Sequence, residues 1–238
     1  MRNFIQAALT LTILVRALPS MADQSYVVQS ISPEGSNLLF EIGYTAGVHK
    51  GSASQVEGLV NFDANNQLTL ANFTVPLSSL STGNSTRDCH MREALGINYE
   101  LSNFPKDHVC EAGDVLPSSG PNSVAYPTIE FEFSKLASSS LPLPSVLVPG
   151  QVYTIEVQGR WKIHGVARDQ TQTPSGESLT LQIQRLNEAG NKLRVQGKFD
   201  VILADFGIIV KPFKIIGPIA INVADRVMVK LNLRLDAL

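Results

Sequence analysis

The chain has 238 residues, a formal net charge of −2 and 44% hydrophobic residues. Its length suffices for one large domain or two small ones. The slightly acidic balance argues against a general nucleic-acid binder, because such a protein carries a basic surface. Beyond residue 22 no apolar run reaches the length of about 20 residues that a membrane-spanning helix needs.

The first 22 residues are typical of a secretory signal peptide. Arg2 gives a positive start, residues 4–15 form an uncharged apolar run, and Ser20 and Ala22 place small side chains at the −3 and −1 positions of a cleavage site. An uncleaved anchor is the alternative. We therefore expect residues 1–22 to be removed and residues 23–238 to form a single domain in the periplasm or outside the cell.

Apolar and polar residues alternate along much of the remaining chain. In residues 128–135 Ile129, Phe131 and Phe133 alternate with polar side chains, and the same pattern recurs at 153–158, 179–186, 193–201 and 227–235. Such alternation predicts strands with one buried and one solvated face.

Segments rich in Gly, Pro, Asn and Ser separate the predicted strands, at 138–150, 171–178 and 187–192. We expect one short helix, at Asp88–Leu95, with Gly96 as its C-terminal cap. Many antiparallel strands with short connections indicate a β-sandwich or a closed barrel.

Residues 85–110 hold both cysteines and two of the four histidines: Cys89, His90, His108 and Cys110. Two cysteines in an exported chain favour one disulfide, which would contribute roughly 3 kcal/mol in the chain-entropy model. A zinc or copper site and two free thiols are the alternatives. The adjacent pair Cys89-His90 does not match the usual ligand spacing of about two to four residues, so we expect no metal.

Motifs that carry catalysis are missing. The sequence has no G-x-S-x-G, H-E-x-x-H or C-x-x-C, and no S-x-x-K with its partner motifs. His49 and His164 each stand near a glycine and are typical of surface or turn histidines. We therefore expect no catalytic residues and no enzyme.

Five stretches in a fixed order resemble a known family. One is Thr82 followed by Arg87-Asp88-x-His90-Met91-Arg92; the others lie at 37–63, 126–136, 157–169 and 195–208. They are similar to the YceI-like family of exported, lipocalin-like barrels associated with polyisoprenoid binding, and the resemblance covers residues 36–235. It implies an all-β, up-and-down antiparallel barrel with a short helix and a long loop inserted between Asn98 and Tyr126.

The resemblance implies a non-enzymatic role in binding, carrying or storing a long isoprenoid or a quinone-like amphiphile inside the barrel. Burial of an alkyl tail contributes about 0.8 kcal/mol per CH₂. Ordinary core packing is the alternative for each inward side chain. The expected lining residues are Phe40, Ile42, Phe131, Phe133, Tyr153, Ile155, Trp161, Phe199 and Phe206.

Arg87, His90 and Arg92 are the expected contacts for an anionic head group at the mouth of the barrel. The alternative is that they hold the helix through pairs such as Asp88–Arg92. Family members often have a histidine where this chain has Tyr44 and an arginine where it has Leu203.

A rival function is a metal- or haem-associated periplasmic redox accessory, with Cys89, His90, His108 and Cys110 as its site. A count of free thiols separates the two, because a disulfide removes two of the metal ligands. Besides the amphiphilic lipid, transient contact with a membrane surface and a homodimer are expected partners, whereas nucleic acid and further cofactors are not.

Overall fold

The computed structural model describes residues 23–29, 36–64, 67–136, 147–169, 179–208, 213–214, 220–221 and 223–238. The expected signal peptide lies outside these residues, as do the connection expected at 171–178 and most of that at 138–150. Within the described ranges, no helix is both long enough and apolar enough to cross a membrane.

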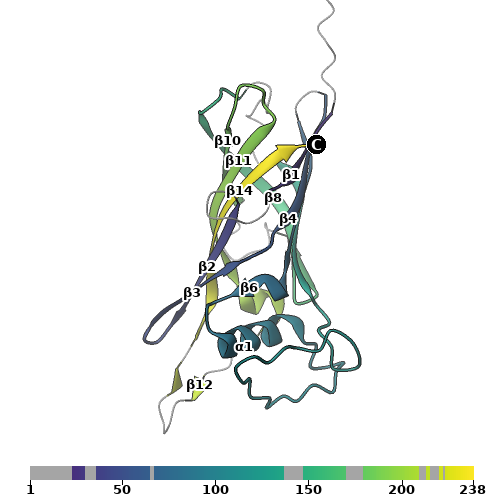
Figure 1. Ribbon diagram of the computed structural model, residues 1–238, viewed down its shortest axis with the longest axis vertical. Coiled ribbons are helices and arrows are strands. Elements are labelled where there is room, and N and C mark those ends of the chain that lie inside the picture. The colour runs from purple at the N-terminus through teal and green to yellow at the C-terminus, as the bar shows by residue number, and fades with distance from the viewer. Residues whose placement is uncertain are drawn as a thin grey trace, which may run out of the picture.

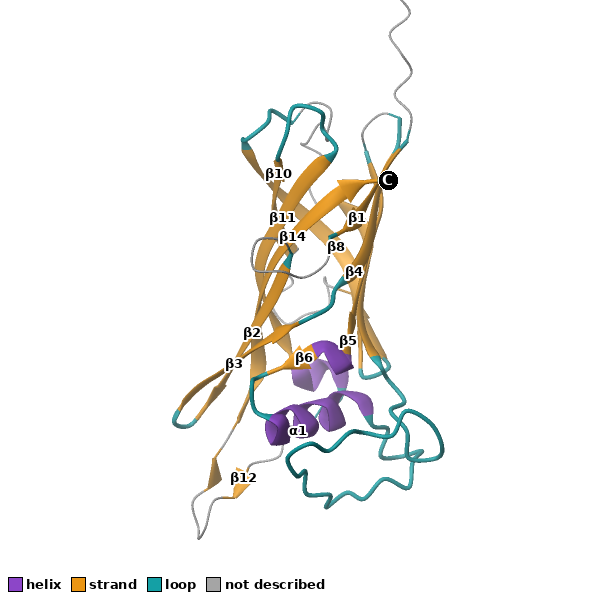
Figure 2. Cartoon of the chain, in the orientation of Figure 1, coloured by secondary structure: helices purple, strands orange, loops and turns teal. Residues whose placement is uncertain are grey.

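The described chain is mostly β-strand with one α-helix (Figure 2). The strands are β1 (Gln24–Val28), β2 (Asn37–Tyr44), β3 (Gly47–Ala53), β4 (Glu57–Phe62), β5 (Leu68–Pro76), β6 (Leu80–Ser81), β7 (Thr128–Leu136), β8 (Val152–Ile163), β9 (Val166–Asp169), β10 (Leu179–Arg185), β11 (Lys192–Ile202), β12 (Phe213–Lys214), β13 (Ala220–Ile221) and β14 (Val223–Ala237). The helix is α1 (Ser85–Gly96), and two 3₁₀ turns are η1 (Leu77–Ser79) and η3 (Leu203–Phe206).

Eight antiparallel strands close a ring in the order β1-β4-β5-β7-β8-β10-β11-β14, and β14 pairs back with β1. The predicted closed antiparallel barrel is confirmed. The 15-residue β14 has two neighbours on one side, because its C-terminal end pairs with β1 while the rest pairs with β2. The sheet then continues from β2 through β3 to β6, so the strand order departs locally from a simple meander.

The helix and the long loop after it lie at the end of the barrel away from the C-terminus (Figure 1). Helix α1 contacts β6 and η1, the short elements that follow β5. The loop leaves α1 at Ile97 and returns to the barrel at β7, which agrees with the predicted insertion. This end of the barrel therefore carries the family motif, both cysteines and the insertion.

Helix α1 is longer than the sequence predicted, because its first turn is capped. The side chain of Asn84 accepts a hydrogen bond of 2.9 Å from the backbone N–H of Arg87. Gly96 is the last helical residue rather than a left-handed cap. A Cβ at Gly96 would lie 2.9 Å from Val124 Cγ1 and 3.1 Å from Leu77 Cδ1, so the glycine is needed for close packing of the insertion.

The predicted inward faces form two clusters of buried side chains. The larger cluster extends from the residues near the C-terminus, where Tyr26, Leu193 and Leu233 are at most 1% exposed, to Leu77 and Leu80 beside α1. The smaller cluster, built on Ile163 and Phe206, packs against the helix α1 side chains. The two clusters adjoin, because partly buried Ile129, Trp161 and Val227 pack against both.

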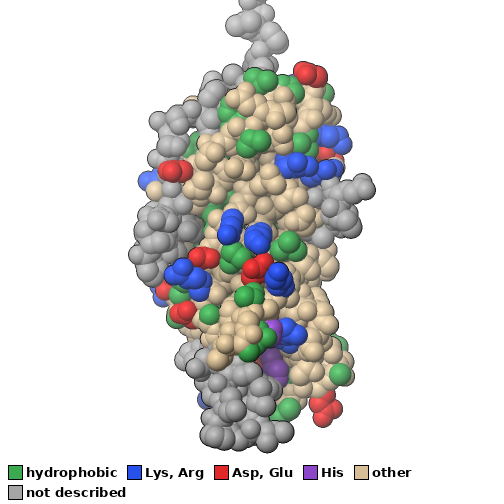
Figure 3. Space-filling model, turned by 90° about the vertical axis from the view of Figure 1, so that its left-hand side faces the viewer, with side chains coloured by type: hydrophobic (Ala, Val, Ile, Leu, Met, Phe, Trp, Pro, Cys, Tyr) green, Lys and Arg blue, Asp and Glu red, His purple; other side chains and the backbone are tan. Residues whose placement is uncertain are grey.

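The outer face of the barrel is solvated. Basic and acidic side chains lie side by side on the face shown in Figure 3. Lys230 pairs with Glu41 at 2.9 Å and Arg226 with Asp200 at 3.2 Å, and these pairs join β14 to β2 and to β11. Exposed pairs of this kind each contribute roughly 0–1 kcal/mol, so stability comes mainly from the interior.

Three inward aromatic rings lie against glycines of adjacent strands. A Cβ added at any of these glycines would come within 2.1 to 2.5 Å of a ring carbon. The missing side chain gives each ring its place along the barrel wall, an arrangement known from other sheets. The pairs are Phe40 with Gly51, Phe73 with Gly58, and Phe131 with Gly159.

We predict that Gly159→Ala lowers the free energy of unfolding by about 1–3 kcal/mol, because the added methyl group meets both the Phe131 ring and the backbone. Urea denaturation measures the change. Gly43→Ala is the matched control on β2, because a Cβ there meets only Ala224, at 3.7 Å. Equal stability of the two variants would refute the packing constraint.

Candidate functional site

The structure places all nine expected lining residues in the interior clusters. Phe40, Phe131, Ile155 and Phe206 are buried, and the other five are partly buried and pack against the clusters. Phe206 comes from η3 rather than from a strand. The barrel wall therefore presents mostly apolar surface on its inner side, contributed by many strands.

Four of the interior rings form a row along the wall. The Trp161 ring lies 4.7 Å from that of Phe131 and 5.3 Å from that of Phe199, and Phe73 lies 6.5 Å from Phe131. The sequence prediction missed Phe73, although Ala71, Phe73 and Val75 alternate with polar residues. Such a row offers continuous apolar contact to an extended chain.

The Arg87 side chain points toward β2 and β3, which lie outside the closed eight-strand ring. Its guanidinium lies 2.5 Å from Nδ1 of His49, and the His49 ring stacks on Tyr44 with centroids 4.1 Å apart. Burial lowers the pKa of His49, and the Arg87 charge lowers it further. The imidazole is therefore held neutral and accepts a hydrogen bond from the Arg87 guanidinium.

The other two expected head-group residues point elsewhere. Arg92 donates a hydrogen bond of 2.5 Å to the backbone carbonyl of Leu80 in β6. His90 has Nδ1 at 3.9 Å from Oε2 of Glu93. The helix thus sends Arg87, His90 and Arg92 toward three different surroundings rather than to one point.

Asp88 clamps α1 to β6. Its buried carboxylate accepts hydrogen bonds from the Ser81 hydroxyl at 2.8 Å and from the Thr82 amide and hydroxyl at 2.7 and 2.6 Å. Burial raises the pKa of Asp88, but these hydrogen bonds and the charge of Arg92 together hold it below its usual value. Most of the family motif therefore positions the helix.

We predict that Asp88→Asn destabilises the protein at neutral pH by about 1–3 kcal/mol, because it removes the charged acceptor of a buried network. Since the folded pKa of Asp88 lies below its unfolded value of about 3.9, the clamp contributes fully above that pH and is lost as the pH falls through the folded pKa. The difference from wild type should therefore shrink below about pH 4.

Urea denaturation across this pH range measures the effect. Asp225→Asn, at an exposed position of β14, is the control and should change little. A difference for Asp88→Asn that stays constant with pH would contradict the clamp.

A disulfide joins Cys89 of α1 to Cys110 of the insertion, with their Cα atoms 6.0 Å apart. It crosses a sequence separation of 21 residues, and neither cysteine is free. The predicted pairing is thus present in the structure. It ties the insertion to the helix.

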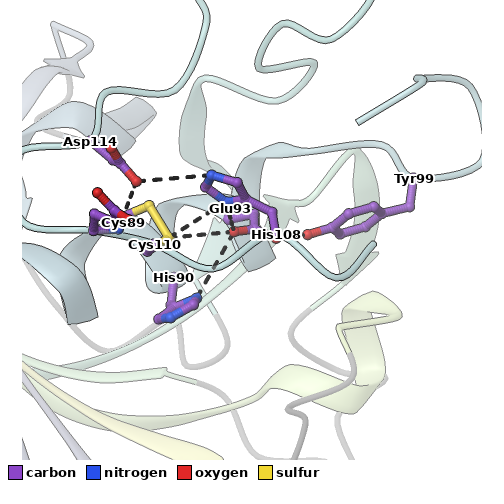
Figure 4. A network of polar contacts seen from close by, with 8 residues as sticks. Cys89, His90, Glu93, Tyr99, His108, Cys110 and Asp114 are labelled. Carbon is purple, nitrogen blue, oxygen red and sulfur yellow. Dashed lines mark hydrogen bonds and ion pairs between the residues drawn. A yellow bond between two sulfur atoms is a disulfide. The ribbon is translucent and has the colours of Figure 1, made fainter. Parts of the chain in front are cut away.

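Polar side chains surround this disulfide (Figure 4). Glu93 is 7% exposed and accepts a hydrogen bond from the Tyr99 hydroxyl. Burial and the neighbouring Glu93 carboxylate raise the pKa of Tyr99 well above its usual value, so the hydroxyl keeps its proton. Nδ1 of His108 lies 3.2 Å from Oε2 of Glu93.

Ligand atoms of Cys89, Glu93, His108 and Cys110 all lie within 4.8 Å of one another. The metal site considered from the sequence contained His90 in place of Glu93. Glu93 could have been found, because it lies four residues after Cys89 and so on the same helix face. In the disulfide state the sulfurs are not thiolates and this set binds no metal through them.

A family model described as the YceI-like domain matches residues 29–106, which include β2 to β6 and α1. The resemblance to the YceI-like family is confirmed. The matched range includes Asp88 and its hydrogen-bond partners Ser81 and Thr82, and it ends within the insertion. A search of curated proteins found no match.

Two solved structures share the fold. A polyisoprenoid-binding domain from Saccharophagus degradans, implicated in plant cell wall breakdown, aligns with a TM-score of 0.57 at 15% identity, over 90% of this chain and 98% of that one. BcnA from Burkholderia cenocepacia aligns with a TM-score of 0.52 at 15% identity, over 84% of this chain and 95% of that one.

Proposed function

We propose that the barrel binds a long-chain isoprenoid or a similar amphiphilic lipid and carries or stores it without changing it chemically. The observation that carries this proposal is the row of rings formed by Phe73, Phe131, Trp161 and Phe199 on the inner wall. The polyisoprenoid-binding domain from Saccharophagus degradans, which shares the fold, supports it.

Burial of the lipid chain would supply most of the affinity. Each buried CH₂ contributes about 0.8 kcal/mol, so a chain of many carbons binds firmly without specific polar contacts. The rings of Phe40, Phe73 and Phe131 lie against glycines, so they cover the wall instead of reaching across the barrel. Partly buried Trp161 and Phe199 then offer the contact surface.

We place the polar head of the lipid at the α1 end, beside Arg87. Among the three residues expected from the sequence, Arg87 is the best placed. Arg92 already binds the Leu80 carbonyl and its charge stabilises the Asp88 carboxylate, and His90 faces Glu93. The described partner of Arg87 is the neutral ring of His49, which leaves the guanidinium charge for a phosphate or carboxylate.

We also propose that the protein is exported, to the periplasm or beyond. The disulfide between Cys89 and Cys110 supports this, because such bonds persist in oxidising compartments. The residues before Asp23 have the pattern of a signal peptide. Contact with a membrane surface remains a prediction, and so does the formation of a homodimer.

Organic extraction of detergent-free protein, followed by mass spectrometry, tests the lipid proposal. We expect the wild type to release an isoprenoid or a related amphiphile. Phe199→Lys places a charge on the inner wall and should lower the lipid content at least tenfold, because desolvating an ammonium group is costly.

Asp200→Lys is the matched control, because this neighbouring residue is exposed on the outer face of β11. It should keep its lipid, and circular dichroism checks that both variants fold. A wild type that releases no lipid, or a folded Phe199→Lys variant with undiminished content, would overturn the proposal.

A further inference from the structure

We propose that Cys89, Glu93, His108 and Cys110 form a tetrahedral site for a zinc-class divalent cation once their disulfide is reduced. The insertion would then stay joined to α1 in both redox states, by a disulfide in one and by a metal ion in the other. This inference does not depend on the lipid proposal, because the site lies between the helix and the insertion rather than in the interior clusters.

The distances between the ligand atoms fit a tetrahedral zinc site. Zinc bonds of about 2.0–2.3 Å place neighbouring ligand atoms about 3.3–3.8 Å apart. Here Nδ1 of His108 lies 3.2 Å from Oε2 of Glu93, and Sγ of Cys110 lies 3.5 Å from that oxygen and 3.8 Å from that nitrogen. All four ligand atoms lie within 4.8 Å of one another, and the two bonded sulfurs would separate on reduction.

The chain supplies these ligands as two local pairs. Cys89 and Glu93 are four residues apart on α1, which puts them on one face of the helix. His108 and Cys110 are two residues apart in the insertion, opposite that face. Helix and loop thus contribute one sulfur and one harder ligand each, a mixed set that suits zinc.

Second contacts orient two of the ligands. The Tyr99 hydroxyl donates to Oε1 of Glu93, which leaves Oε2 directed at the sulfur and the imidazole. Oδ2 of Asp114 lies 3.9 Å from Nε2 of His108, so the ring nitrogen that faces away from the site has a carboxylate partner. Figure 4 shows Tyr99 and Asp114 on the outer sides of Glu93 and His108. Metal-binding side chains are commonly held by such outer partners.

Glu93 also has a physical reason to bind a cation. It is 7% exposed, and beside the Tyr99 hydroxyl and the His108 ring its carboxylate charge has no lysine or arginine partner among the contacts of the described residues, so burial of that charge is costly. The contact of 3.5 Å with Cys110 supplies no hydrogen bond in the oxidised state, because a disulfide sulfur carries no proton. A bound divalent cation would compensate this charge directly.

The chemistry balances with a dithiol reductant. The dithiol gives two electrons and two protons to the Cys89–Cys110 bond, which breaks to two thiols while the reductant becomes a disulfide. Binding of the cation then releases the two thiol protons to solvent and leaves two thiolate ligands.

Cobalt(II) titration of the purified protein tests the site. After reduction with a phosphine in metal-free buffer, we expect one cobalt ion per chain, with the intense visible absorption of a tetrahedral thiolate site, and displacement of the cobalt by zinc. The oxidised protein should give no such absorption. His108→Ala and Glu93→Gln should each weaken cobalt binding at least tenfold.

The matched control is His164→Asn. This histidine contacts the Leu95 carbonyl, and its φ of 52° is a conformation that asparagine tolerates. It should bind cobalt like the wild type. Equal losses in His164→Asn and His108→Ala, or no tetrahedral cobalt spectrum in the reduced wild type, would overturn the proposal.

A second measurement covers variants that fold poorly. Zinc should raise the thermal unfolding temperature of the reduced wild type but not that of a variant with both cysteines changed to serine. No rise in the wild type, or the same rise in both proteins, contradicts the site. Lipid content, measured by extraction, tells failure of this site apart from failure of the lipid proposal.

Discussion

The rest of the structure depends on the pairing of β14 with two partners along the same side. Its C-terminal end meets β1 and closes the ring, and its remaining length meets β2 and carries the β2–β3 hairpin toward the helix. Closure removes the free edges of the eight-strand ring, while β2, β3 and β6 extend from it. It also directs every inward side chain toward one shared interior, which an open sheet could not do.

The motif of Thr82 and Arg87–Arg92 mainly holds helix α1 in place. Asp88 holds α1 on β6 and Thr82 through three hydrogen bonds, Arg92 reaches the Leu80 carbonyl, and the disulfide ties the insertion to the helix. Arg87 is then left beside His49 with its charge available. The same helix thus separates a candidate head-group contact from a cluster of sulfur, carboxylate and imidazole.

The alternation of residues such as Leu179, Leu181 and Ile183 sufficed to predict strands and inner faces, because period two is a local property of the backbone. Choosing a barrel needed the family resemblance, since sandwich and barrel share that period. The sequence could not predict that Gly96 packs against the insertion or that His108 of the insertion lies beside Glu93. Both depend on where a long loop returns, which no local pattern specifies.

The central claim is that the apolar interior holds an extended lipid chain along the ring row. Trp161 is the only tryptophan of the chain and lies within that row, so its fluorescence reports the interior directly. We predict that an isoprenoid alcohol carrying a nitroxide quencher, added to delipidated protein, quenches Trp161 saturably near one molecule per chain, and that unlabelled isoprenoid reverses the quenching. Quenching that never saturates, or that unlabelled lipid does not reverse, would contradict the account.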